Sequence, residues 1–335
     1  MAAFEGGRIG RRGLLGVGLG LASGLVLAKP SFAQSGSDDV PSLAGKRIAI
    51  SVVGTDHFFD LKSYQAQIAE VERLGGTPIG LDAGRNDKQL VAQLQTLLTQ
   101  KPDAVIQQLG TLPVFDNQLK RLRAAGIPVF TIDVPSTNSI NNTTSDNFSL
   151  GAQLALQLVS DIGGKGNLVV FNGFAGVPVC EIRYQELLQV LKYYPDVKIV
   201  QPELRDVIPN TVQDSYAQIT ALLSKYPEKG SISAIWSAWD IPQLGATQAL
   251  IAAGRTEILT YGVDGTPEVL SLVKDPKAPA GAVAVQQPSL IGTAAVQNVA
   301  RYLAGQTLPS QTFLPAVIAN KKNAAEVQRQ VGQAT

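Results

Sequence analysis

Continuous apolar runs alternate with amphipathic segments along most of the chain, and this alternation limits the fold more than any other feature. Residues 47–53 and 77–82 have the composition of buried strands, and residues 87–99 have the spacing of a helix with one apolar face. The apolar runs do not alternate with polar residues, which is typical of parallel strands covered on both faces. The sequence therefore predicts an α/β fold built on parallel sheets.

The alternating series occurs twice. The first ends near Asp133 and is followed by turn-forming and polar residues over Pro135–Asn147, the composition of a connection between domains. A second series extends over residues 148–262, and the chain of 335 residues is long enough for two cores. We expect two similar doubly wound, Rossmann-like lobes, followed by a strand at 282–286, a helix from Pro288 and a last short strand at 313–318.

The amino-terminal segment has the pattern of an export signal. Arg11 and Arg12 precede a glycine-diluted apolar stretch, and Ser31-Phe-Ala33 supplies small residues at the spacing of a cleavage site. We expect a signal peptide over residues 1–33. The paired arginines favour the twin-arginine route, and an ordinary secretory signal is the alternative. Residues 34–44 are polar and without periodicity, so we expect a flexible tether.

Charge and rare residues narrow the function further. Removal of residues 1–33 takes away four basic residues and one acidic residue, which leaves 24 basic and 26 acidic residues and no basic surface for a nucleic acid. One histidine and one cysteine cannot form a zinc site, and phosphate-loop and nucleophile-elbow motifs do not occur. Cys180 cannot form an internal disulfide or carry a lipid anchor after the signal. We expect a freely diffusing, monomeric periplasmic protein without metal, cofactor or enzymatic activity.

Two loops carry the clearest functional signal. The strand 46–53 leads into a polar loop with Phe58 and Phe59, and the strand 258–261 leads into Gly262-Val-Asp-Gly-Thr-Pro267. In an open α/β sheet, the carboxyl ends of the strands are where ligands bind. Both loops resemble those of the periplasmic sugar-binding proteins of ABC transporters, of the ribose-binding type, and the resemblance covers about residues 45–320.

The resemblance implies how the lobes are joined. In that family the chain crosses between the lobes three times, which here falls near Ser145, Gln287 and Leu314. Three short crossings form a hinge that can close around a ligand in the cleft. The expected lobe boundaries are 45–145 plus 288–313 for the amino-terminal lobe and 146–287 plus 314–335 for the carboxy-terminal lobe.

The resemblance also implies a set of ligand contacts. Phe58 and Phe59 occupy the positions where that family stacks aromatic rings on a sugar, since the C–H faces of a sugar pack well on aromatic faces. Charged acceptors form strong hydrogen bonds with hydroxyl groups. The acceptor positions are taken by Asp56, Asp133 and Asp264, with Gln286 as a hinge-side amide.

The sequence departs from the family pattern at several of these positions. Val134 follows Asp133 where an arginine is usual, and Glu181 falls where a second arginine is usual. Arg183 lies two residues after Glu181, and a shift of register would turn it inward instead. Further candidates are Trp239 at a position that is usually asparagine, Asp240 beside it, and Arg205 in a long loop that could restore a positive charge.

These residues predict a solute-binding protein that captures a small sugar or polyol between two closing lobes and delivers it to an ABC permease. The acid-rich cleft leaves open a cationic amino sugar, amino-cyclitol or small amine as the ligand, because unpaired buried acids are costly. A sensory binding protein that serves a receptor kinase is a further alternative. Paired carboxylates also leave open a glycoside hydrolase, although hydroxyl binding accounts for the same acids.

Overall fold

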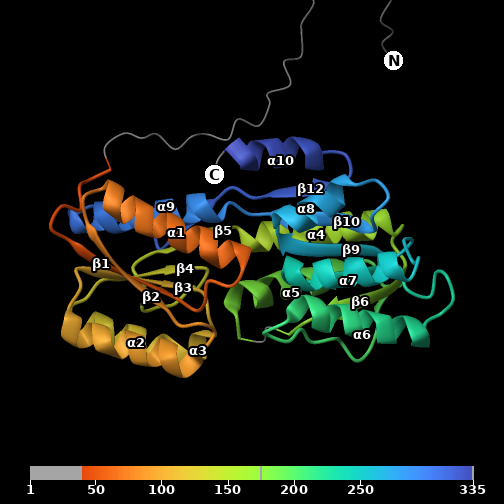
Figure 1. Ribbon diagram of the computed structural model, residues 1–335, viewed down its shortest axis with the longest axis horizontal. Coiled ribbons are helices and arrows are strands. Elements are labelled where there is room, and N and C mark those ends of the chain that lie inside the picture. Colours follow the sequence, from red (N-terminus) through yellow and green to blue (C-terminus); the bar gives the residue numbers. More distant parts are fainter. Residues whose placement is uncertain (1–39, 174–175, 334–335) are drawn as a thin grey trace, which may run out of the picture. The chain divides into compact units, whose positions relative to one another are not determined.

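The protein has two six-stranded sheets, each covered by helices on both faces. The computed structural model describes residues 40–173 and 176–333 (Figure 1). The expected signal peptide and most of the expected tether lie outside the described residues. No helix within the described ranges is long and apolar enough to cross a membrane.

The first sheet belongs to the amino-terminal lobe and is entirely parallel. Its strands, in spatial order, are β11 (Gln311–Leu314), β5 (Asn142–Ser145), β4 (Val129–Ile132), β3 (Ala104–Gln108), β1 (Arg47–Val52) and β2 (Thr77–Asp82). Successive residues of a strand point to opposite faces. Ile48 and Ile50 accordingly pack into one apolar cluster, while Ala49 packs into another on the opposite face.

Four helices cover this sheet. Residues of α1 (Phe58–Arg73) and α9 (Pro288–Leu303) pack on the face that holds Ile48, and residues of α2 (Asp87–Gln100) and α3 (Leu112–Ala124) pack on the other. The pairing of α1 with α9 brings a segment from near the end of the chain into the first lobe (Figure 1). Two covered faces are what the continuous apolar runs predict.

The second sheet repeats the plan. Its spatial order is β12 (Val317–Asn320), β10 (Ala280–Val285), β9 (Leu259–Asp264), β8 (Ala234–Ser237), β6 (Gly166–Phe171) and β7 (Val197–Ile199), and only β12 runs antiparallel to its neighbour. The order of β7, β6, β8, β9 and β10 matches that of β2, β1, β3, β4 and β5 in the first sheet. The expectation of two similar doubly wound lobes is confirmed.

The helices of the second lobe divide between the two faces in the same way. One face is covered by α4 (Asn147–Asp161) and α5 (Pro178–Leu191), and the other by α6 (Thr211–Lys225) and α7 (Asp240–Ala252). A separate cluster joins α8 (Pro267–Lys274) and α10 (Ala324–Gln333) to β10 and β12.

The chain passes between the two sheets at three places. It leaves β5 after Ser145 and enters α4, leaves β10 after Val285 and enters α9, and leaves β11 after Leu314 to enter β12. These are the three crossings that the resemblance implies.

Three local expectations are wrong. The polar stretch expected to be only a connection contains β5, whose four residues are all buried. The strand expected at 313–318 is two strands, one in each sheet. The end of the expected tether is packed, because Leu43 is fully buried and its N–H donates to Leu74 O at 2.7 Å.

Candidate functional site

A cavity of about 590 Å³ is lined by residues of both lobes. Its lining comes from the segments that follow the carboxyl ends of parallel strands, including Phe58 after β1, Asp133 after β4, Trp239 after β8 and the end of β9 at Asp264. This is the edge at which an α/β sheet binds ligands. The topology therefore brings together side chains that are more than 200 residues apart in the sequence.

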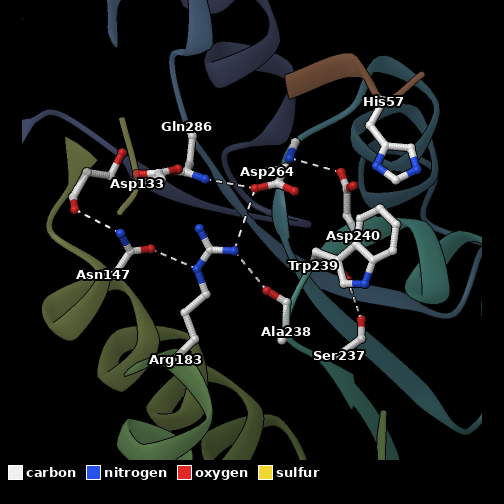
Figure 2. A network of polar contacts seen from close by, with 12 residues as sticks. His57, Asp133, Asn147, Arg183, Ser237, Ala238, Trp239, Asp240, Asp264 and Gln286 are labelled. Atoms are coloured by element: carbon white, nitrogen blue, oxygen red, sulfur yellow. Dashed lines mark hydrogen bonds and ion pairs between the residues drawn. The ribbon is translucent and has the colours of Figure 1, made fainter. Parts of the chain in front are cut away.

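A polar network crosses the base of the cavity from one lobe to the other (Figure 2). Thr144 donates to the Asp133 carboxylate, and Asn147 Nδ2 donates to Thr144 Oγ1 at 3.0 Å. Arg183 Nε donates to Asn147 Oδ1 at 2.7 Å, and Arg183 Nη1 lies 3.8 Å from Asp264 Oδ1. The network thus links a carboxylate of each lobe through the first crossing of the hinge.

Two further contacts hold this arrangement in place. Arg183 Nη1 also donates to the backbone oxygen of Ala238 at 2.9 Å, and Gln286 Nε2 donates to Asp264 Oδ1 at 2.7 Å. A buried charge is tolerated only when it is paired and hydrogen-bonded. The Arg183 guanidinium meets that condition, because it contacts Asn147, Ala238 and Asp264. Arg183 also lines the cavity.

Asp240 anchors the turn that follows β9. Its Oδ2 accepts hydrogen bonds from the N–H groups of Gly265 and Thr266, at 3.0 and 2.6 Å. Thr266 is the N-cap residue of α8, but its side chain makes no capping bond. Asp240 Oδ1 and Thr266 Oγ1 are buried without a hydrogen-bond partner in the described ranges. Both residues line the cavity.

Burial raises the pKa values of the cavity carboxyl groups. It raises the pKa of Asp264 well above its ordinary value, against the positive charge of Arg183. Burial also raises the pKa of Asp133, again against Arg183. Burial raises the pKa of Asp240 to about 6, and the backbone N–H groups that it accepts oppose the shift. In all three carboxyl groups, burial is the largest cause of the shift.

Aromatic side chains provide apolar walls. Phe58 and Phe59 begin α1, and both line the cavity, with Phe58 half-buried and Phe59 buried against the core of the first lobe. Trp239 lines the cavity from the second lobe as the N-cap residue of α7. Trp236, which shares the sequence motif of Trp239, is fully buried in the core of its lobe. Of the two tryptophans, Trp239 therefore lines the cavity and Trp236 does not.

Arg85 introduces a positive charge that sequence reasoning missed. It follows β2, and its Nε donates to Asp56 Oδ1 at 2.7 Å while its Nη2 pairs with Asp60. Asp56, His57 and Asp60 are close enough to share a metal ion, but the guanidinium already pairs with both carboxylates and contacts the imidazole. Arg85 is therefore the centre of this cluster. Asp56 pairs with Arg85, so its main role is to hold that side chain rather than to accept from a ligand.

Helix phase decides between Glu181 and Arg183. Along α5, Cys180 and Arg183 are buried and line the cavity, whereas Glu181 is exposed and outside the lining. Residues spaced by three or four positions share a face of a helix. The placement of Glu181 at the cavity is therefore wrong, and the inward orientation of Arg183, the alternative from a shifted register, is the one that the structure has.

The remaining sequence candidates lie near the cavity without lining it. Arg205 is exposed, and its loop reaches the cavity through Ile208 and Pro209 instead. Gln286 is buried behind Asp264 and acts on that carboxylate rather than on the cavity itself. The cleft is rich in acids, as expected, but two arginines, Arg85 and Arg183, line it as well.

The residues that sequence reasoning missed share one signal. Arg85 and Thr266 each follow a parallel strand of the sheet within three residues, at the edge where ligands bind. Arg85 comes after the well-predicted strand β2 in a turn with Gly84, both with positive φ. A search of every strand end, rather than of the family positions alone, would have found it.

Comparison with known proteins agrees with this geometry. Residues 48–307 match the family model described as a periplasmic binding protein domain. A solute-binding protein of an ABC transporter from Agrobacterium vitis, solved with bound allitol, is 68% identical, with a TM-score of 0.85 over 86% of this chain and all of that one. An ABC sugar transporter subunit from Rhodobacter sphaeroides is 62% identical, with a TM-score of 0.83 over 84% of this chain and all of that one.

A more distant relative extends the comparison. The ribose import binding protein of Escherichia coli is 26% identical over 272 residues, which cover 79% of this chain and 86% of that protein. The family match spans well over half of the chain, and the solved relatives have the same two-lobed architecture. The chain therefore belongs to the periplasmic binding protein domain family.

Proposed function

We propose that this protein captures a small polyol or sugar between its two lobes and delivers it to an ABC permease. The main support is the placement of Asp133 and Asp264, one from each lobe, on one cavity with Arg183 between them in a continuous network. A ligand hydroxyl can donate to a carboxylate and accept from a guanidinium at once. A molecule with several hydroxyls can therefore satisfy both lobes and favour their closure.

The ion pairs of the cavity and a solved relative favour a neutral ligand over a cationic one. Seven carboxyl groups and two arginines line the cavity, and Arg85 and Arg183 pair with Asp56, Asp60 and Asp264. At Asp56, Asp60 and Asp264, an ammonium group would have to compete with a guanidinium group that is already present. The relative from Agrobacterium vitis was solved with allitol, an uncharged polyol, which makes allitol the first ligand to test.

The proposed ligand contacts are of two kinds, polar and apolar, and further residues hold the polar ones in place. Asp133, Asp264 and Asp240 accept ligand hydroxyls, and Arg183 donates to them. Phe58, Phe59 and Trp239 cover the apolar C–H faces of the ligand. Gln286 holds Asp264 from behind, and Asp56 holds Arg85.

We further propose export to the periplasm through residues 1–33, with cleavage after Ala33 by the pattern of small residues. The intact mass of the protein recovered from the periplasm tests the cleavage site. Replacement of both Arg11 and Arg12 with lysine should block export if the twin-arginine route is used. Unchanged export of that variant would favour the ordinary secretory route instead.

A thermal-shift screen tests the proposed ligand class. The panel contains allitol and other hexitols, pentitols, aldoses, and a matched set of amino sugars, amino-cyclitols and small amines. A ligand at 100 times its dissociation constant stabilises the folded state by about 2.7 kcal/mol, enough for a clear rise in Tm. We expect polyols or sugars to raise Tm, whereas a rise with amines alone would reject the proposal.

Two measurements distinguish transport from the alternatives. Release of a product would indicate catalysis, and dependence on a receptor kinase would indicate sensing. The acids of the cavity are engaged in a hydrogen-bonded network, which supports binding without hydrolysis. Incubation with a panel of glycosides should therefore release no product. Uptake of the captured ligand should require the cognate permease, and a response that depends instead on a receptor kinase would assign the protein to sensing.

A further inference from the structure

Two aromatic rings meet across the cavity, one from each lobe. His57 precedes α1 and Trp239 precedes α7, and their ring centroids are 4.6 Å apart with an interplanar angle of 47° (Figure 2). Figure 2 shows this pair at the opposite end of the site from Asp133 and Gln286. The lobes therefore touch through this aromatic pair as well as through the polar network near the hinge and through Leu109, which packs against the core of the second lobe.

Each ring is held from its own lobe. Trp239 Nε1 donates to Oδ2 of the buried Asp206 at 2.5 Å. Arg85 Nη2 donates to His57 Nδ1 at 2.5 Å. A ring that is fixed before contact loses less conformational entropy when it packs than a freely rotating ring does. The pair is therefore preorganised on both sides.

Arg85 is itself fixed by two carboxylates. Its guanidinium pairs with Asp56 and with the buried Asp60, and its side chain is only 19% exposed. Arginine is always protonated and can only donate, so His57 Nδ1 must accept and the ring proton of a neutral imidazole must be on Nε2. Nε2 lies 3.5 Å from Asp56 Oδ2, which suits a proton on that atom. Arg85 thus sets both the orientation and the tautomer of His57.

We propose that His57 and Trp239 form a latch that holds the lobes closed over the ligand, and that Arg85 is the residue that positions the imidazole for it. The inference rests on the proposed function, because a latch acts only when the lobes open and close. Opening must separate the two rings and expose them to water, so the latch slows ligand release more than it changes ligand entry. Burial and the charge of Arg85 lower the pKa of His57 to about 4, which keeps the ring neutral against Trp239.

A double-mutant cycle on ligand release tests the latch. The variants are His57→Ala, Trp239→Leu and the double variant, with allitol as the probe and dissociation rates measured by surface plasmon resonance on immobilised protein. Aromatic pairs contribute about 0.5–1.5 kcal/mol beyond their buried area, so we expect His57→Ala to speed release about fivefold. Because Trp239 is its partner, the same change should have little effect in the Trp239→Leu background.

The matched control for the cycle is Leu61→Ala, at a half-exposed position of α1 outside the cavity lining, which should leave release unchanged. Release from His57→Ala at the wild-type rate, or additive effects of the two changes, would overturn the latch and leave the proposed function standing. Failure of the wild-type protein to bind allitol or any other polyol or sugar would overturn both.

A spectroscopic test isolates the role of Arg85. His57 is the only histidine, so ¹⁵N-labelled histidine gives ring signals that need no assignment. At pH 7 the two nitrogen shifts of the wild-type protein should report one tautomer, with the proton on Nε2. Arg85→Lys keeps a positive charge beside Asp60 but loses the planar fork, so we expect mixed tautomers and release as fast as from His57→Ala.

Arg121→Lys is the control for this substitution, since Arg121 is on α3 and donates to Gln118 rather than to a cavity residue. It should change neither the ring shifts nor the release rate, and thermal melting confirms that each variant is folded. An Arg85→Lys protein with the wild-type tautomer and the wild-type release rate would show that Arg85 does not position His57.

Discussion

Asp133 and Asp264 have backbone conformations that residues other than glycine rarely adopt. Their φ angles are +58° and +125°, and both residues stand where a parallel strand ends at the cavity. Such conformations cost on the order of 1–3 kcal/mol and persist only where the surroundings enforce them. Both side chains are also held by a hydrogen bond, from Thr144 to Asp133 and from Gln286 to Asp264. One carboxylate of each lobe thus lines the same cavity.

Replacement of Arg183 separates its role in binding from its role in stability. Arg183→Leu should lower the free energy of unfolding by about 3–5 kcal/mol, because Asp264 loses its buried partner. It should also weaken allitol binding about 100-fold, since the truncation of a buried charge costs several kcal/mol in affinity. Urea unfolding and titration calorimetry measure the two effects.

Arg255→Leu provides the matched control. Arg255 is also a buried arginine of the second lobe, paired with Glu257 at 2.6 Å, and it does not line the cavity. We expect a loss of stability with unchanged affinity for allitol. Equal losses of affinity in the two variants would mean that Arg183 acts only through the stability of the lobe.

The pKa of Asp240 predicts how stability changes with pH. Burial raises it from 3.8 to about 6, so between these values the folded state holds a proton that the unfolded state has released. The resulting stabilisation is fully present below about pH 4 and is lost as the pH rises through about 6. For the ligand-free protein, the contribution of this group to the free energy of unfolding should fall by on the order of 2 kcal/mol between pH 4 and 7.

The comparison with Asp240→Asn in urea unfolding at several pH values checks this decline. Asparagine keeps an oxygen that can accept from Gly265 and Thr266 but removes the titration, so the variant should show a smaller fall. Asp196→Asn, at an exposed position of the same lobe, should keep the wild-type profile. Parallel profiles for the wild-type protein and Asp240→Asn would contradict the assignment.

The sequence predicts some strands of this fold well and misses others. The strand expected at 77–82 is β2 with the same bounds, because its short run of residues between two turns is a local signal, although β2 is an edge strand whose residues are exposed or half-buried. β5 has no such signature, since Asn142, Thr143, Thr144 and Ser145 are all polar. Their burial depends on partners far along the chain, such as Gln311, which accepts from Asn142 at 2.9 Å.

The same limit applies to the site. Asp133, Asp240, Asp264 and the aromatic residues were predictable because their loops resemble a known pattern at strand ends. The choice between Glu181 and Arg183 depends on the rotation of α5, which its packing against α4 fixes rather than its own sequence. The position of Arg85 depends on a turn and on three partners far from it in the sequence, Asp56 and His57 before α1 and Asp60 in its first turn.

The turn between β9 and α8 offers a test at the level of one element. Gly265 has a φ of +82°, and a Cβ there would lie 2.8 Å from the Val285 side chain. Gly265→Ala should therefore combine left-handed strain with overpacking and cost about 3 kcal/mol. The displaced turn should also move Asp264, so we expect weaker allitol binding in calorimetry.

Gly230→Ala is the control for this turn, because Gly230 has a φ of +83° and open space around it. It should cost about 1 kcal/mol, the strain alone, and leave ligand affinity unchanged. Equal costs at the two positions would mean that the contact with Val285 contributes nothing to the turn.

At the scale of the whole molecule, the three crossings and the contacts between the lobes act together. The polar network runs beside the first crossing, where Asn147 begins α4, and the His57–Trp239 pair closes the other end of the site. Closure around a ligand buries the carboxylates with their hydroxyl partners in a water-poor cavity, where such hydrogen bonds are stronger than in water. The protein thus couples ligand capture to a change between open and closed lobes.

Titration calorimetry with allitol tests the central claim most directly, with the wild-type protein beside Asp133→Asn and Asp264→Asn. Each substitution removes a charged acceptor from one lobe and keeps the size of the side chain. The account predicts saturable one-site binding by the wild-type protein and at least tenfold weaker binding by each variant, since hydrogen bonds to charged groups contribute about 1.5–3 kcal/mol. Unchanged affinity in both variants, or binding of amines but of no polyol or sugar, would contradict it.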